Sequence, residues 1–155
     1  MRTYSVLMAL ALFSMLLIGL QLSALPASEP TIDAEVNIQP QVFNLKRRGV
    51  ITAYISNLTE EDVSYDVLDI NASTIRLYHE EHVVTEPLRS AVEDNILTVK
   101  FDAAIVADYI WSILYHMGTI PPQENYTMTF TVSGRLFNNE QFAGSDTIKI
   151  THELP

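Results

Sequence analysis

The sequence predicts an all-β fold in the main, an antiparallel β-sandwich with one inserted amphipathic helix at about residues 102–117. Apolar and polar residues alternate in several short segments, which is typical of strands with one buried and one solvated face. Turn-forming residues separate these segments, and a series of short strands with turns between them favours a sandwich. A single stretch instead repeats its apolar residues at helical spacing. An N-terminal signal or anchor helix is expected before the domain.

The clearest predicted strand is residues 126–133, where apolar residues alternate with threonine and serine (YTMTFTVS). The pair Asn138-Asn139 can adopt positive φ, so it suits a hairpin turn into a partner strand at 141–151. Shorter alternating or apolar segments predict further strands around residues 34–38, 42–45, 50–56, 75–77 and 97–101.

The predicted helix begins at Asp102, a good N-cap residue. Gly118 and the following Pro121-Pro122 end it. We expect its apolar stripe to cap one end of the sandwich and Trp111, which lies off the stripe, to be partly exposed. The residues of that stripe are Ile105, Val106, Tyr109, Ile110, Ile113, Leu114 and Met117.

Residues 1–28 have the order of a secretory signal. Arg2 precedes the apolar run 6–22, and small residues follow it near a cleavage point. The run is almost long enough to cross a bilayer, so an uncleaved membrane anchor is the alternative. We therefore expect a signal peptide or anchor at 1–28, a linker at 29–33 and one domain at 34–155. The protein is expected to be secreted or displayed on the cell surface, held by residues 6–22 if these are retained.

The composition excludes several classes of partner and site. The chain has 155 residues, with 19 Asp and Glu against 9 Lys and Arg, for a formal charge of −10. Nucleic-acid binding is not expected, because phosphates require a basic face. The chain contains no cysteine, which excludes disulfides, thiolate nucleophiles and cysteine-based metal sites. Hydrophobic packing must therefore stabilise the domain.

Four stretches resemble a known family. They are Asp66–Leu77 (DVLDINASTIRL), Leu97–Ile105 (LTVKFDAAI), Thr129–Leu136 (TFTVSGRL) and Gly144–Ile150 (GSDTIKI). Together they are similar to a small immunoglobulin-like β-sandwich domain that recurs in secreted and cell-surface proteins of archaea and bacteria. The resemblance covers roughly residues 34–150 and implies a fold rather than an activity.

Members of that family often carry a calcium-binding loop rich in aspartate and glycine before the strand that here begins at Ile96. The corresponding residues 89–95 read RSAVEDN, with three oxygen ligands and no glycine. The acidic run Glu60-Glu61-Asp62, followed by Asp66 and Asp69, has no calcium-binding spacing and is typical of a solvated loop. We expect no cofactor, with weak Ca²⁺ binding as the alternative.

Three sequons make Asn57, Asn71 and Asn125 candidate glycosylation sites, each at an expected strand end or turn. Asn57 is the preferred acceptor because a loop is expected to follow it. The alternative for Asn71 is a local turn or cap, since asparagine side chains bond nearby backbone N–H groups.

The run His79-Glu80-Glu81-His82 invites a zinc site. Residues three apart on one strand face opposite sides, and the helical zinc motif needs a spacing of four. We therefore expect a solvated charged turn and no metal ligand.

No nucleophile, base and orienting group can be named together, so an enzyme is not expected. The preferred hypothesis is a structural or interaction module with a role in adhesion, envelope structure or assembly. Its partners would be other cell-surface or envelope proteins or glycans. One alternative is a module that binds a small ligand or carbohydrate through Tyr109, Trp111 and Tyr115. The other is a filament subunit assembled by exchange of the strand Ala34–Ile38.

Overall fold

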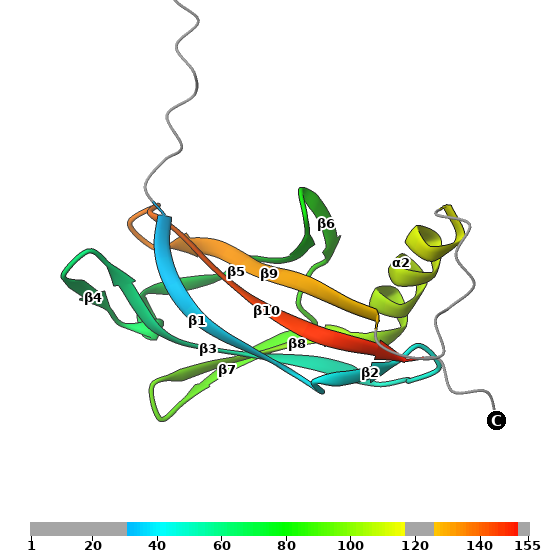
Figure 1. Ribbon diagram of the computed structural model, residues 1–155. Helices are drawn as coiled ribbons and strands as arrows, with labels where there is room; N and C mark the ends of the chain where they lie inside the picture. Colours follow the sequence, from blue (N-terminus) through cyan, green and yellow to red (C-terminus); the bar gives the residue numbers. More distant parts are fainter. Residues whose placement is uncertain (1–30, 117–125, 152–155) are drawn as a thin grey trace, which may run out of the picture.

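The computed structural model describes residues 31–116 and 126–151, and within them the chain is mainly β (Figure 1). The predicted signal or anchor at 1–28 lies outside the described residues. No helix among those described has the length and apolar character needed to cross a membrane. The elements are β1 (Thr31–Gln39), β2 (Val42–Asn44), β3 (Val50–Glu60), β4 (Val63–Tyr65), the 3-10 turn η1 (Val67–Asp69), β5 (Ile70–His79), β6 (His82–Thr85), β7 (Arg89–Glu93), β8 (Ile96–Asp102), α2 (Ala103–His116), β9 (Tyr126–Leu136) and β10 (Gln141–Thr151).

The strands form one continuous hydrogen-bonded sheet in the order β6-β5-β9-β10-β1-β3-β8-β7, with β2 beside β10 and β4 beside β3. The sheet curls into an open half-barrel (Figure 1). Most neighbouring strands are antiparallel, as expected, but β1 and β2 both run parallel to β10. The prediction of a mainly β fold is confirmed.

Strand β1 changes partner along its length. Residues 31–33 pair with the start of β10, and Asp33 and residues 35–39 pair with β3, with an irregularity in register between Asp33 and Glu35. The strand therefore includes residues 31–33, which the sequence assigned to the linker. Thr31-Ile32-Asp33 continues the alternation of β1, with Ile32 1% exposed, so the strand begins before the predicted boundary at residue 34.

The core lies on the inner face of the sheet. In β9, Met128, Phe130 and Val132 are buried, which confirms the predicted alternation. Facing strands contribute large fully buried side chains, and α2 adds Ile110. The aromatic members of this set are Phe43, Phe101, Phe130 and Phe142. The chain thus builds a continuous apolar core without any covalent crosslink.

Helix α2 starts directly after Asp102, whose Oδ1 accepts the backbone N–H of Ala104 at 2.8 Å. The predicted start is confirmed, but the buried stripe is rotated. Ile105 is 47% exposed, whereas Ala103 and Ala107 are buried. The helix contacts β3, β6 and β8. The small side chains of Ala103 and Ala107 face the sheet, where they allow the helix backbone to lie close to the strands.

The structure corrects two predicted loops. Residues 89–93 form β7, and only Asp94 and Asn95 make the turn into β8, with φ of 50° and 60°. Two positive φ values suit a tight two-residue hairpin. In addition, β3 continues through Asn57 to Glu60 rather than ending at a loop.

Candidate functional site

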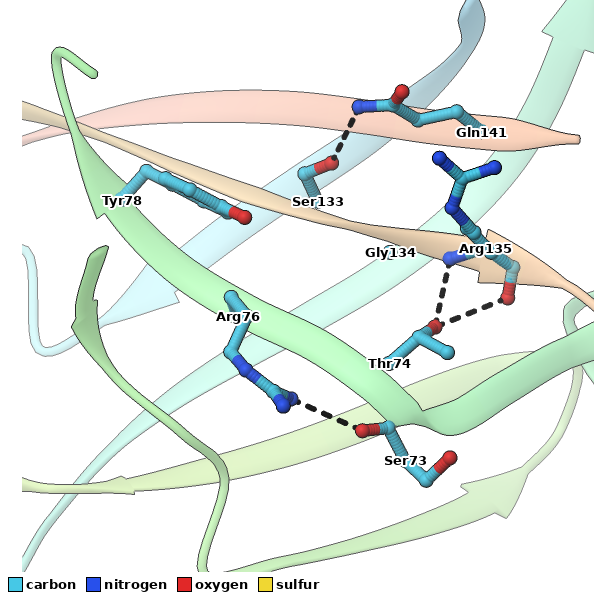
Figure 2. Close-up of a pocket in the computed structure, with 8 residues that line it drawn as sticks. All are labelled: Ser73, Thr74, Arg76, Tyr78, Ser133, Gly134, Arg135 and Gln141. Carbon is cyan, nitrogen blue, oxygen red and sulfur yellow. Dashed lines mark hydrogen bonds between the residues drawn. The ribbon is translucent and has the colours of Figure 1, made fainter. Parts of the chain in front are cut away.

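A polar hollow of about 370 Å³ lies on the outer face of the sheet, across β5, β9 and β10 (Figure 2). Two arginines, a tyrosine and several hydroxyl and amide side chains line it, and none of the lining residues is acidic. We call this hollow the arginine groove. Its lining residues are Ser73, Thr74, Arg76, Tyr78, Ser133, Gly134, Arg135 and Gln141.

Strand alternation explains why polar side chains gather on this face. In β5, Ile75 and Leu77 are buried in the core. Because successive residues of a strand point to opposite faces, Arg76 and Tyr78 point outward. The register places Arg76 opposite Ser133. The two strands therefore bring residues that are distant in sequence side by side.

The pairing of β9 with β10 also brings polar residues together, because Arg135 lies opposite Gln141 (Figure 2). Ser133 is only 9% exposed, and its Oγ accepts a hydrogen bond from Gln141 Nε2 at 3.4 Å. The floor of the groove is thus a nearly buried hydroxyl, with Arg135 at its rim.

A bulge in β5 shapes the other end of the groove. The register between β5 and β9 shifts between Asn71 and Arg76. Thr74 Oγ1 fills the gap, because it accepts the backbone N–H of Arg135 at 2.8 Å and donates to the Asn71 carbonyl at 2.7 Å. This ties the irregular segment to β9 and holds Ser73 at the groove.

The two arginines differ in their partners. Arg76 forms an ion pair with Glu86 at 3.0 Å and donates to the carbonyls of Ser73 and Ile75 at 3.0 and 2.7 Å. Arg135 donates to the Asn139 carbonyl at 3.0 Å and has no carboxylate partner within the described part of the chain. Arg135 is therefore the cation available to an anionic group.

A second hollow of about 690 Å³ lies between α2 and the β5–β6 hairpin. Tyr109 is half-buried there and its hydroxyl lies 3.1 Å from His79 Nδ1. Burial raises the pKa of Tyr109, and the nearby carboxylate of Glu80 raises it further. The full lining is His79, Glu80, His82, Tyr109, Ile113, His116 and Tyr126.

The argument that separated His79 from His82 was wrong in its geometry. The two residues lie on different strands, directly opposite each other across a two-residue turn. Opposite residues in an antiparallel pair share a face, so both line this hollow. The expected turn itself is present, with Glu80 and Glu81 exposed. Across residues 31–116 and 126–151, no three His, Asp or Glu side chains are grouped so that they could hold a metal ion.

The helix aromatics do not form one face. Tyr109 lines the second hollow, while Tyr115 is 83% exposed. Trp111 is partly exposed, as expected, and packs against the core. Trp111 and Tyr115 share a side of the helix because they are four residues apart, and Tyr109 points away from that side.

The sequons fall in three different settings. Asn57 is exposed in β3, has a left-handed φ of 47°, and its Nδ2 donates to Glu35. Asn71 Oδ1 accepts the backbone N–H and the hydroxyl of Ser73, so it acts as the local turn residue that was the alternative. Asn125 lies outside the described residues.

Comparison with family models, curated proteins and solved structures finds no match for this chain. The arginine groove was not predicted from the sequence. The available signal was Arg76, between the apolar residues of the predicted strand 75–77; Arg135 lies beyond the predicted strand 126–133, and the pairing of the two strands could not be derived from local pattern.

Proposed function

We propose that the chain is a non-catalytic interaction module of the cell surface, built as an immunoglobulin-like sandwich. The pairing order supports this fold, because it divides at β1 into β7-β8-β3-β1 and β6-β5-β9-β10. If β1, β3, β8 and β7 correspond to strands A, B, E and D, and β5, β9 and β10 to C, F and G, these are the two sheets of an immunoglobulin domain. The parallel contact of β1 with β10 then joins the two sheets at one edge.

Export to the surface is part of the same proposal and rests on the N-terminal sequence. Arg2, the apolar run 6–22 and the small residues after it have the composition of a secretory signal or a retained anchor. N-terminal sequencing of the mature protein tests this. A start near Ser28 supports release, an intact N-terminus in a washed membrane fraction supports anchoring, and an intact N-terminus in the cytosol contradicts export.

The ligand proposed for the module is an acidic glycan held in the arginine groove. The observation that carries this is the guanidinium of Arg135, which has no carboxylate partner among the described residues and lies beside a set of hydroxyl and amide groups, in a chain with a net charge of −10. Arginine is suited to carboxylate and sulfate groups because its planar donors match their oxygens in pairs.

The rest of the groove suits a sugar. Ser133, Ser73 and Gln141 offer donors and acceptors to hydroxyl groups, and Tyr78 adds an apolar ring surface. No lining residue is acidic, and the Glu86 carboxylate is paired with Arg76 at 3.0 Å, so the Arg135 end of the groove is the end suited to a carboxylate on the ligand. The proposal therefore favours uronic-acid or sulfated glycans over neutral ones.

Calorimetric titration of the purified protein with oligogalacturonate, and with its neutral methyl ester of equal length, tests the ligand class. We expect binding of the acidic form only, and a loss of about tenfold or more in affinity in Arg135→Gln, as for a charged hydrogen bond. Arg48→Gln is the matched control, because Arg48 is exposed in the segment between β2 and β3 and is not part of the groove. Equal binding of the neutral ester, or unchanged affinity in Arg135→Gln, would contradict the proposal.

A second candidate is a small ligand in the hollow beneath α2. The observation that favours it is the convergence of His79, Tyr109 and Tyr126 on a space of about 690 Å³. Trp111 is the single tryptophan of the chain and lies on the same helix, so its fluorescence reports on this end of the molecule. A fluorescence change on ligand addition that is lost in Tyr109→Ala supports this site. A change retained in that variant contradicts it.

Assembly by exchange of the strand Ala34–Ile38 stays a prediction. In the structure this segment pairs with β3 through Glu35–Ile38, and the residues of β1 that pair with β10 are 31–33.

A further inference from the structure

Strand β7 is the open edge of the sheet. Among the described residues it pairs only with β8, and all five of its residues are exposed. At the other end of the pairing order, β6 contacts α2. Figure 1 shows β7 on the outside of the molecule, away from that helix. An exposed edge presents unpaired backbone groups to which another strand can add.

The charges on β7 are unbalanced within the chain. Arg89 lies directly opposite Lys100 on β8. Like charges at opposite positions destabilise a strand pair. Neither side chain forms an ion pair in the part of the chain that the structure describes. A carboxylate on the far side of β7 would relieve this repulsion.

The sequence of β7 provides such a carboxylate when two copies meet. If two β7 strands pair antiparallel about a two-fold axis at Ala91, Arg89 of each copy lies opposite Glu93 of the other, and Ser90 lies opposite Val92. Two opposite-charge pairs form, and Ala91 of each copy lies opposite Ala91 of the other at the axis.

The backbone amide groups on the open edge of β7 are also placed to form this symmetric pairing. In a hairpin closed by two residues, the residues that flank the turn form a hydrogen-bonded pair with each other. Here these are Glu93 and Ile96, so alternate residues of β7 direct their amide groups to β8. The amide groups of Ser90 and Val92 consequently face outward, and in the symmetric pairing they meet each other.

We propose that the chain forms a symmetric homodimer by antiparallel pairing of β7 with β7 of a second copy. This inference is independent of the groove and of the glycan. The contact is short, so the dimer is weak in solution. Many copies on one surface strengthen such a contact through their high local concentration.

Sedimentation equilibrium of the exported protein, from micromolar to millimolar concentration, tests the dimer. We expect a reversible monomer–dimer equilibrium that shifts toward monomer in Ser90→Pro, because proline removes the outward N–H without disturbing the pairing with β8. Ala143→Ser on β10 is a control that leaves β7 intact. A strict monomer over the whole range overturns the proposal.

Charge exchange tests the register. R89E alone and E93R alone should each weaken self-association, since each places like charges opposite one another at both positions. An equimolar mixture of the two variants should recover the dimer, because every pair is then opposite in charge. Circular dichroism establishes that each variant is folded. If the mixture associates no better than either variant alone, the proposed register is wrong.

Discussion

A Cβ atom added to Gly144 would collide with the carbonyl oxygen of Ala34 and lie 2.5 Å from Val36 Cγ2. This is the point at which β1 leaves β10 and moves to β3. The two backbones approach so closely there that only glycine fits on β10. The crossing therefore depends on one residue whose side chain is a hydrogen atom.

Gly144→Ala should lower the free energy of unfolding by about 3 kcal/mol, at the upper end for overpacked positions. The backbone of β1 cannot move aside without breaking its pairing with β3. Urea denaturation measures the loss. Gly134→Ala is the comparison, because there the added Cβ meets the side chain of Phe142 at 2.8 Å and no backbone atom, and a smaller loss of about 1 kcal/mol is expected. Equal losses in both variants would show that the crossing is not the constraint.

Ile110→Ala should cost about 3 kcal/mol of stability, since the Ile110 side chain of α2 is fully buried in the core and its truncation leaves a cavity. Ile105→Ala removes the same atoms from a side chain that is 47% exposed and should cost about 0.5 kcal/mol. Thermal or urea unfolding of the two variants distinguishes the observed stripe from the predicted one. Similar losses in both variants would support the stripe that the sequence predicted, because that stripe includes both residues.

Asp102→Ala should destabilise the protein by about 1 kcal/mol, because the first turn of α2 loses the acceptor for the Ala104 N–H. Asp108→Ala makes the same change in charge at an exposed helical position and should stay within about 0.5 kcal/mol of the wild type. Paired urea titrations compare them. Similar values for both would mean that charge, and not capping, accounts for the effect.

The raised pKa of Tyr109 predicts a loss of stability at high pH. The folded state favours the neutral phenol, so its contribution is complete below the ordinary pKa of 10.0 and is lost as the pH rises through the folded value. Unfolding free energy measured between pH 8 and pH 11 should therefore fall less steeply in Tyr109→Phe than in the wild type. Parallel curves for the two proteins would exclude Tyr109 as the cause.

Local pattern predicted the parts of the fold in which one face of an element is apolar. The alternation in β9 identified its buried residues, and Asp102 marked the start of α2. It failed at β7, because the segment RSAVE lies at an open edge and buries no face that could produce alternation. A strand held only by backbone pairing leaves little trace in sequence.

The sites were harder to predict for a related reason. The arginine groove depends on the register that sets Arg76 opposite Ser133 and Arg135 opposite Gln141, and register is a property of the folded sheet. The same holds for His79 and His82, whose shared face follows from a turn between them and not from their spacing along one strand.

The parallel pairing of β1 and β2 with β10 has a mechanical consequence. Residue 31 at the start of β1 and residue 151 at the end of β10 lie at opposite ends of these parallel ladders. A tensile force applied between them pulls the strands along each other in shear, so the hydrogen bonds of the ladders share the load instead of opening one after another. A domain held at one end and pulled at the other would resist extension through this geometry.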